Sequence, residues 1–237
     1  MSRSSFSYIP IGRMESITGQ ILSDYGFDPD DKQVRSVPIE EIVEFHYDLQ
    51  ICWEAIDRLD AEGMVMAAII PDRKQIILNE THRDLFDKKI GTYHFTLAHE
   101  LGHWVLHAPG QSYLRSGSEY GPGYMRSDSA PENSSDADTY YCRSTSHKPA
   151  EEIQADLFAG CLLMPRPMMV RAVKQLNMLG AIQLPHIYGL ADCLKVSISA
   201  LSVRLKQLRL LQIESDGRVS RADGRSAPAC EQLTMDL

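Results

Sequence analysis

A His-Glu-x-x-His motif within residues 95–107 has the residue types and spacing best suited to chemistry in this chain. Apolar residues surround the motif and predict one buried helix. Because residues four apart lie on the same face of a helix, His99 and His103 can both direct a ring nitrogen at one metal ion. Glu100 can then reach a water molecule on that ion without binding the metal itself. Two neutral nitrogens, a carboxylate base and a metal ion are the groups needed to hydrolyse an amide.

A second helix, predicted over residues 149–165, carries the candidate third ligand. Glu152 and Asp156 are four residues apart in it, so their side chains share a face. A catalytic zinc site takes three protein ligands and leaves one position to water, and we expect Glu152 to be the third ligand. We expect Asp156 to accept a hydrogen bond from the ring nitrogen of a ligating histidine that faces away from the metal. The alternative is an acidic first turn exposed to water, which suits Glu151 better than Glu152.

Together, the two motifs resemble those of the ImmA/IrrE family of metallopeptidases. These are gluzincins, which are zinc peptidases with two histidine ligands and one glutamate ligand. The matching positions are Phe-Thr-Leu-Ala-His-Glu-x-x-His at residues 95–103, Glu-x-x-Ala-Asp-x-Phe-Ala at residues 152–159 and Leu-Leu-Met-Pro at residues 162–165. The resemblance covers most of residues 35–211.

The resemblance implies that His99, His103 and Glu152 bind Zn2+, with Mn2+ as the other candidate metal, and that Glu100 is the general base. It implies a zinc-dependent endopeptidase. The expected partner is a protein substrate, a helix-turn-helix transcriptional repressor that is cleaved at a specific site in a stress or mobile-element response. The resemblance also suggests that an edge strand of a small sheet pairs with the extended substrate backbone.

The elements needed to position these residues predict an α+β fold that is mainly helical, and the resemblance implies a zincin-like metallopeptidase domain. Short apolar runs at residues 64–70 and 75–79 are separated by a turn that starts at Pro71, and they predict a small antiparallel β-sheet. Residues 38–49 begin with proline, have two glutamates in the first turn and predict a helix. Small residues such as Ala155 would let the second metal-binding helix approach the first closely.

We interpret the chain as a flexible N-terminal arm at residues 1–13, a metallopeptidase domain at 14–211 and a disordered tail at 212–237. Within the domain, residues 108–148 predict a long loop insert between the two metal-binding helices. A lid, a spacer and a substrate-specificity insert are the alternatives for this loop, and we favour the last. Residues 186–211 predict two helices joined by a short turn, which is a helix-turn-helix-like segment.

The composition restricts the classes of partner and compartment. The net charge of −8 argues against nucleic acid as the main ligand, so we expect no direct DNA binding. No apolar run has the length of a membrane span or the position of a signal peptide, and we expect no membrane association. The five cysteines are odd in number and lack C-x-x-C spacing, which favours a reducing compartment and predicts a cytoplasmic protein. The oligomeric state is left open.

Two other functions remain as alternatives. One is a DNA-binding transcriptional regulator that uses the helix-turn-helix-like segment, where Arg204, Lys206 and Arg209 supply positive charge, and whose metal site is structural or sensory. The other is a protein that binds a repressor without cleaving it. The presence of Glu100 disfavours this second alternative, because a structural metal site needs no carboxylate at that position.

His107 continues the four-residue spacing of the motif histidines by one further step. As a fourth ligand it would close the coordination position that a catalytic metal keeps open for water. We therefore expect His107 to be a non-ligand at the end of the helix, where the helix dipole favours a positive charge.

Overall fold

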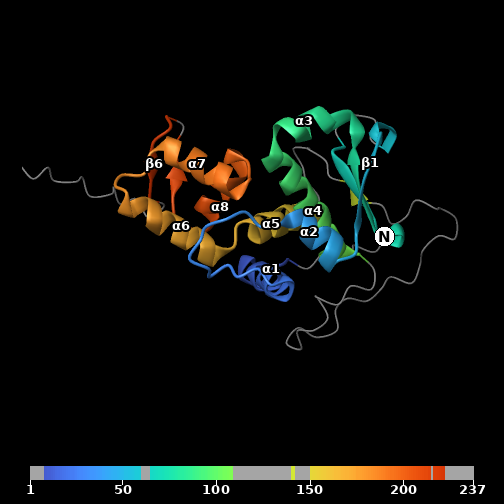
Figure 1. Cartoon of the computed structure of the whole chain (residues 1–237), viewed down its shortest axis with the longest axis horizontal. Helices are drawn as coiled ribbons and strands as arrows, with labels where there is room; N and C mark the ends of the chain where they lie inside the picture. The colour runs from blue at the N-terminus through green and yellow to red at the C-terminus, as the bar shows by residue number, and fades with distance from the viewer. Residues whose placement is uncertain (1–7, 60–64, 109–139, 142–149, 215, 222–237) are drawn as a thin grey trace, which may run out of the picture.

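The computed structural model describes residues 8–59, 65–108, 140–141, 150–214 and 216–221. It confirms the predicted α+β class, with helices as the main elements (Figure 1). The α-helices are α1 (Ile11–Tyr25), α2 (Ile39–Glu41), α3 (Arg83–Lys88), α4 (Ile90–His107), α5 (Ala150–Leu163), α6 (Arg166–Met178), α7 (Leu184–Leu194) and α8 (Ile198–Gln207). The short 3₁₀ or π segments are η1 (Ile42–His46), η2 (Asp57–Leu59), η3 (Pro71–Arg73) and η4 (Glu80–His82). The strands are β1 (Gln50–Glu54), β2 (Ala67–Ile70), β3 (Gln75–Asn79), β4 (Tyr140–Tyr141), β5 (Gln212–Ile213) and β6 (Val219–Ser220).

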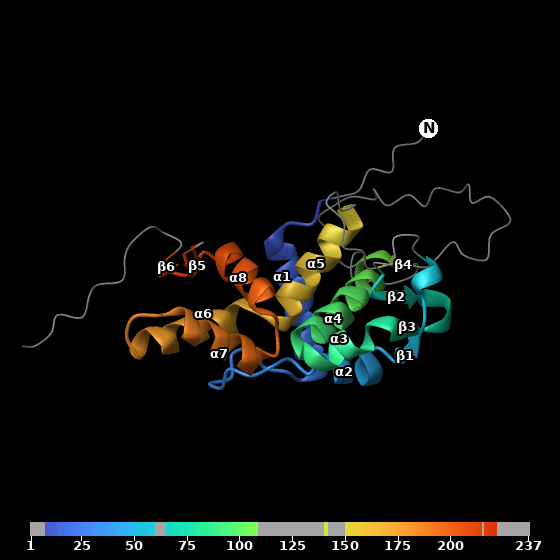
Figure 2. The same cartoon turned by 90° about the horizontal axis from the view of Figure 1, so that it is seen from above.

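Helices α4 and α5 lie side by side at the centre of the molecule, between the sheet and the C-terminal helices (Figure 2). In α4, every residue from 96 to 106 is buried, which is expected of a core helix that is covered on all faces. Strand β2 packs against α4, while α1 and α8 pack against α5. None of the described helices, α4 included, is long and apolar enough to cross a lipid bilayer.

Small residues allow α4 and α5 to approach closely, as the sequence predicts. A Cβ atom on Gly102 would lie 3.2 Å from the Cα atom of Ala155 and 3.1 Å from a ring carbon of Phe158. Ala155 and Phe158 are fully buried at this interface. The contact lies one residue before His103, so the same packing that joins the helices also places the motif against α5.

The larger sheet has the strand order β1-β3-β2-β4 and is mixed. The predicted hairpin is confirmed, because β2 and β3 are antiparallel with Ile69 opposite Ile76. The prediction of a wholly antiparallel sheet is wrong, because β1 pairs in parallel with β3, with Ile51 opposite Ile76. The chain passes from β1 to β2 and then returns as β3 between them. This insertion is a long-range arrangement that short apolar runs in the sequence do not specify.

The helix predicted over residues 38–49 is shorter and less regular than expected. Its α-helical part, α2, has three residues and continues as the π-helical segment η1, which ends at His46. Asp48 then adopts a left-handed conformation with φ of 54°. The reversal at this residue ends the helical segment and leads the chain into β1.

Both ends of the described chain have more regular structure than the sequence predicts. Helix α1 begins within the expected arm at residues 1–13, and Ile9 before it is buried in the core. Strands β5 and β6 pair within the tail at residues 212–237 that was expected to be disordered. The rest of the arm and tail, and most of the predicted loop insert at residues 108–148, lie outside the described residues.

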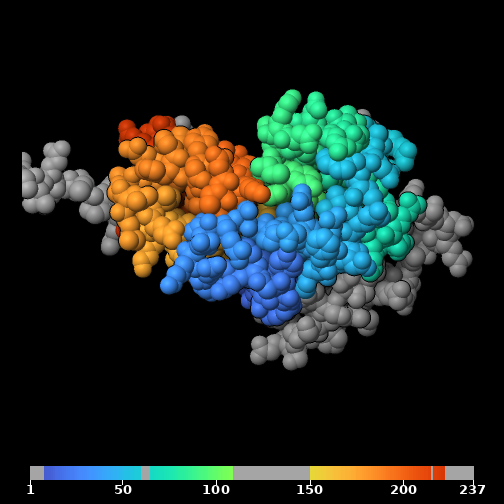
Figure 3. Space-filling view, viewed as in Figure 1, coloured from blue at the N-terminus to red at the C-terminus, as the bar shows by residue number. Residues whose placement is uncertain are grey.

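Helices α7 and α8 form the predicted pair joined by a short turn. Lys195 is left-handed after α7, and the hydroxyl of Ser197 accepts a hydrogen bond from the amide of Ala200 to cap α8 (3.1 Å). The segment between α1 and α2, coloured blue, runs along these C-terminal helices (Figure 3). Arg171 of α6 donates to the carbonyl of Pro29 in that segment (3.0 Å). The C-terminal helices are thus tied to the N-terminal part of the chain.

The start of α4 lies so close to the turn between α7 and α8 that only glycine fits. A Cβ atom on Gly91 would lie 2.4 Å from backbone atoms of Val196 and Ser197. We expect Gly91→Ala to lower the free energy of unfolding by about 1–3 kcal/mol, because the backbone must move. Gly19→Ala in α1 is the matched control, since its Cβ would meet nothing within 4 Å and alanine stabilises a helix by about 1 kcal/mol. Urea unfolding measures both, and equal stabilities would contradict this close approach.

Candidate metal centre

His99, His103 and Glu152 meet at the interface of α4 and α5, and all three are buried. The Nε2 atoms of the two histidines are 3.1 Å apart. The carboxylate of Glu152 spans both rings, with one oxygen 3.3 Å from Nε2 of His99 and the other 3.3 Å from Nε2 of His103. Ligands at roughly 2.0–2.1 Å from a tetrahedral zinc ion lie about 3.4 Å from one another. These three side chains could therefore hold a metal ion.

Asp156 contacts the side of the His99 ring that faces away from this group. Its Oδ1 atom is 3.0 Å from Nδ1 of His99. An ionised carboxylate can only accept a hydrogen bond, so Nδ1 of His99 carries the proton and Nε2 keeps a lone pair. This is the contact that the sequence predicts for Asp156, and it would hold the His99 ring in an orientation suited to a metal ion.

Glu100 is fully buried beside these residues. Neither of its oxygens meets hydrogen-bond geometry with a described residue, although the backbone amide of Ile69 is near enough to oppose weakly the rise in its pKa. Burial is the main cause that raises the pKa of Glu100 to about 8. His99 opposes this rise, whereas the charge of Glu152 adds to it. A buried carboxyl group without partners costs stability, and such groups are concentrated at functional sites.

The protonation of the other groups suits metal binding. Although burial alone would raise the pKa of Glu152, the adjacent imidazole rings of His103 and His99 lower it to about 2. Burial is the main cause that lowers the pKa of His103. The folded protein therefore favours an ionised Glu152 and a neutral His103, which are the forms that bind a metal ion.

The sequence did not predict that His107 contacts Gln154 beside His103. The Nδ1 atom of His107 is 3.0 Å from Nδ1 of His103, and its Nε2 atom is 3.0 Å from Oε1 of Gln154 in α5. Burial lowers the pKa of His107 to about 4, so the expected positive charge at the end of α4 is wrong. Two spacings could have indicated the pair: His107 is four residues after His103, and Gln154 is two residues after Glu152.

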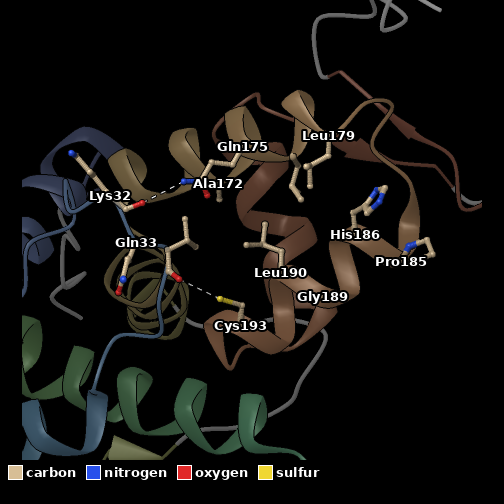
Figure 4. A pocket seen from close by; sticks show the side chains of 12 residues that line it. Lys32, Gln33, Ala172, Gln175, Leu179, Pro185, His186, Gly189, Leu190 and Cys193 are labelled. Atoms are coloured by element: carbon tan, nitrogen blue, oxygen red, sulfur yellow. Dashed lines mark hydrogen bonds between the residues drawn. The ribbon is translucent and has the colours of Figure 1, made fainter. Parts of the chain in front are cut away.

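A hollow of about 670 Å3 lies between α6, α7 and residues 32–34, away from the metal centre, and none of the metal-centre residues line it (Figure 4). Gln175 donates to the carbonyl of Lys32, and the thiol of Cys193 lies 3.3 Å from the carbonyl of Val34. The surface that lines this hollow is mainly apolar. Within the described ranges, the group at α4 and α5 is the one cluster of three or more side chains suited to a metal ion.

Comparisons with known proteins do not identify this centre. No family model matches the chain, and no curated protein matches it. A function for the metal centre therefore has to be inferred from its own residues and their geometry.

Proposed function

We propose that this protein is a zinc-dependent endopeptidase of the gluzincin type, similar to the ImmA/IrrE metallopeptidases. The observation that carries the proposal is the buried carboxyl group of Glu100, which forms no full hydrogen bond with a described residue and lies beside three candidate ligands. A structural metal site is satisfied by its ligands and needs no further buried carboxyl group, whose burial is costly. A peptidase needs such a group to accept a proton from water.

In the proposed reaction, His99, His103 and Glu152 would hold the ion, and three protein ligands are the number found in catalytic zinc sites. Bound zinc supplies Lewis acidity and lowers the pKa of water from 15.7 to roughly 7. Glu100 takes the proton as water attacks the peptide carbonyl and delivers it to the leaving amine. Asp156 keeps the His99 ring in its metal-binding orientation. Two histidines and one carboxylate form a ligand set that suits zinc, and manganese is the second candidate.

The substrate that we propose is a helix-turn-helix transcriptional repressor, as the resemblance of the two motifs implies. The position of the neighbouring sheet supports an extended peptide as substrate. Strand β2 packs against α4, and the backbone amide of its Ile69 is near enough to Glu100 to lower the pKa of that carboxyl group weakly. The outer edge of β2 pairs with β4, with Ile69 opposite Tyr140. A bound peptide would therefore pair with β4 or take its place beside β2.

The DNA-binding alternative is weakened by the burial of Arg204. Its side chain is 1% exposed, forms an ion pair with Glu15 of α1 at 3.0 Å and donates to the carbonyl of Met164. These contacts hold α8 against the rest of the core, so the charge of Arg204 is not accessible to a DNA backbone. Lys206 and Arg209 remain exposed, but two positive charges are few in a chain of net charge −8.

Incubation of the whole protein with a helix-turn-helix repressor encoded beside its gene tests the proposal. We expect specific cleavage with zinc or manganese, no cleavage with a chelator and none by the Glu100→Gln variant, because the metal and the base act together. Gel electrophoresis and mass spectrometry locate the cut. Binding without cleavage by the zinc-loaded protein would contradict a peptidase and favour a repressor-binding protein. Absence of binding would contradict this class of substrate.

A further inference from the structure

Three side chains form a continuous hydrogen-bonded chain that ends at the metal centre. It runs from Oε1 of Gln154 to Nε2 of His107, and from Nδ1 of His107 to Nδ1 of His103, with 3.0 Å at each step. The Nε2 atom of His103 lies at the far end and faces the Nε2 atom of His99 and the carboxylate of Glu152. The chain therefore links α5 to α4 a second time, independently of Asp156.

The proton positions in this chain follow from one end. The amide oxygen of Gln154 can only accept a hydrogen bond, so Nε2 of His107 carries a proton and donates a hydrogen bond to that oxygen. In the neutral ring, Nδ1 of His107 then has a lone pair and accepts from Nδ1–H of His103. A neutral His103 with its proton on Nδ1 keeps the lone pair of Nε2 for the metal. If His107 donated the hydrogen bond to Nδ1 of His103 instead, the proton of a neutral His103 would lie on Nε2, and this nitrogen could not bind an ion.

We propose that His107 and Gln154 are positioning residues that hold His103 in the tautomer and orientation required of a metal ligand. The two ligating histidines are then supported in different ways. His99 donates to a charged carboxylate, whereas His103 donates to a neutral imidazole that is itself held by a neutral amide. A charged hydrogen-bond acceptor makes a ligating histidine more basic than a neutral acceptor does. His103 is therefore the ligand whose metal binding depends more on geometry.

Substitution of Gln154 tests the direction of this chain. Gln154→Met has a similar length but no acceptor, and we expect a 10–100-fold weaker zinc affinity, the usual effect of losing a partner of a ligating histidine. Gln154→Glu restores an acceptor and should recover the parent affinity or exceed it. Gln175→Met is the matched control, because Gln175 lies in α6 and donates to the carbonyl of Lys32. Competition with a chromophoric chelator measures the affinities.

Nitrogen-15 NMR of the zinc-loaded parent protein gives a readout that needs no substitution. We expect the proton of His107 on Nε2 and that of His103 on Nδ1. A His107 proton on Nδ1, or a Gln154→Met variant that binds zinc as tightly as the parent, would overturn the proposal. The inference rests on the metal site of the proposed function but not on peptide hydrolysis. A protein with these tautomers that cleaves nothing would retain the positioning role and lose the peptidase.

Discussion

Replacing Glu100 with glutamine is expected to lower the rate of peptide hydrolysis by at least about 10²–10⁴-fold, the usual contribution of a general base. Glutamine has nearly the same size but cannot accept a proton from water. Glu100 is not one of the three clustered candidate ligands, so the variant should bind zinc as the parent does. Loss of turnover with intact zinc binding would show that Glu100 acts as the base and is not a metal ligand.

The measurement pairs the cleavage rate of the repressor substrate with the zinc content of each protein. Glu54→Gln in β1 is a suitable control, because this carboxylate is exposed at the end of the strand and should leave both quantities unchanged. A Glu100→Gln protein that cleaves at the parent rate would show that another group acts as the base.

The same substitution should have a pH-dependent effect on the stability of the metal-free protein. The pKa of Glu100 is about 8 in the folded state against an ordinary value of 4.5, so the folded state binds more protons between these values. Stability due to this group therefore falls as pH rises from about 4.5 to 8, by up to about 1.4 kcal/mol per pH unit. Glu100→Gln should remove this loss. Urea unfolding at pH 5 and pH 8 should show a larger gain from the substitution at pH 8.

Replacing Glu152 with glutamine is expected to weaken zinc binding by more than about 100-fold, which is the upper effect of losing a residue that only supports a ligand. The amide has no charge and cannot replace a carboxylate that contacts both histidines. Glu151→Gln is the matched control, one residue earlier on the same helix. Because Glu151 is not part of the ligand cluster, its substitution should leave zinc affinity within a few-fold of the parent.

Acidification should release zinc through the histidines rather than through Glu152. The pKa of Glu152 is about 2, so this carboxylate stays ionised across the range in which imidazoles take up protons. A zinc titration from pH 7 to pH 4 measures the loss of affinity in the parent and in both variants. If Glu151→Gln lost zinc and Glu152→Gln kept it, the third ligand would have been assigned to the wrong glutamate.

The sequence by itself determined the parts of this protein that depend on local periodicity. The helical repeat of 3.6 residues places His99 and His103 on one face of α4, and Glu152 and Asp156 on one face of α5. The two short apolar runs on either side of the turn at Pro71 likewise predict the β2–β3 hairpin. In each case the spacing of neighbouring residues decides which side chains point the same way, so no knowledge of distant contacts is needed.

Only the tertiary structure decided the features that depend on which elements meet. It placed β3 between β1 and β2 and so made the sheet mixed. It buried Arg204 against Glu15 and withdrew a charge that the sequence had assigned to the surface. It also brought Gln154 to His107. Burial and partner choice are set by packing between distant segments, and they determine the pKa of a buried group and the proton position on a histidine ring. The spacing of residues along the chain specifies neither that pKa nor that proton position.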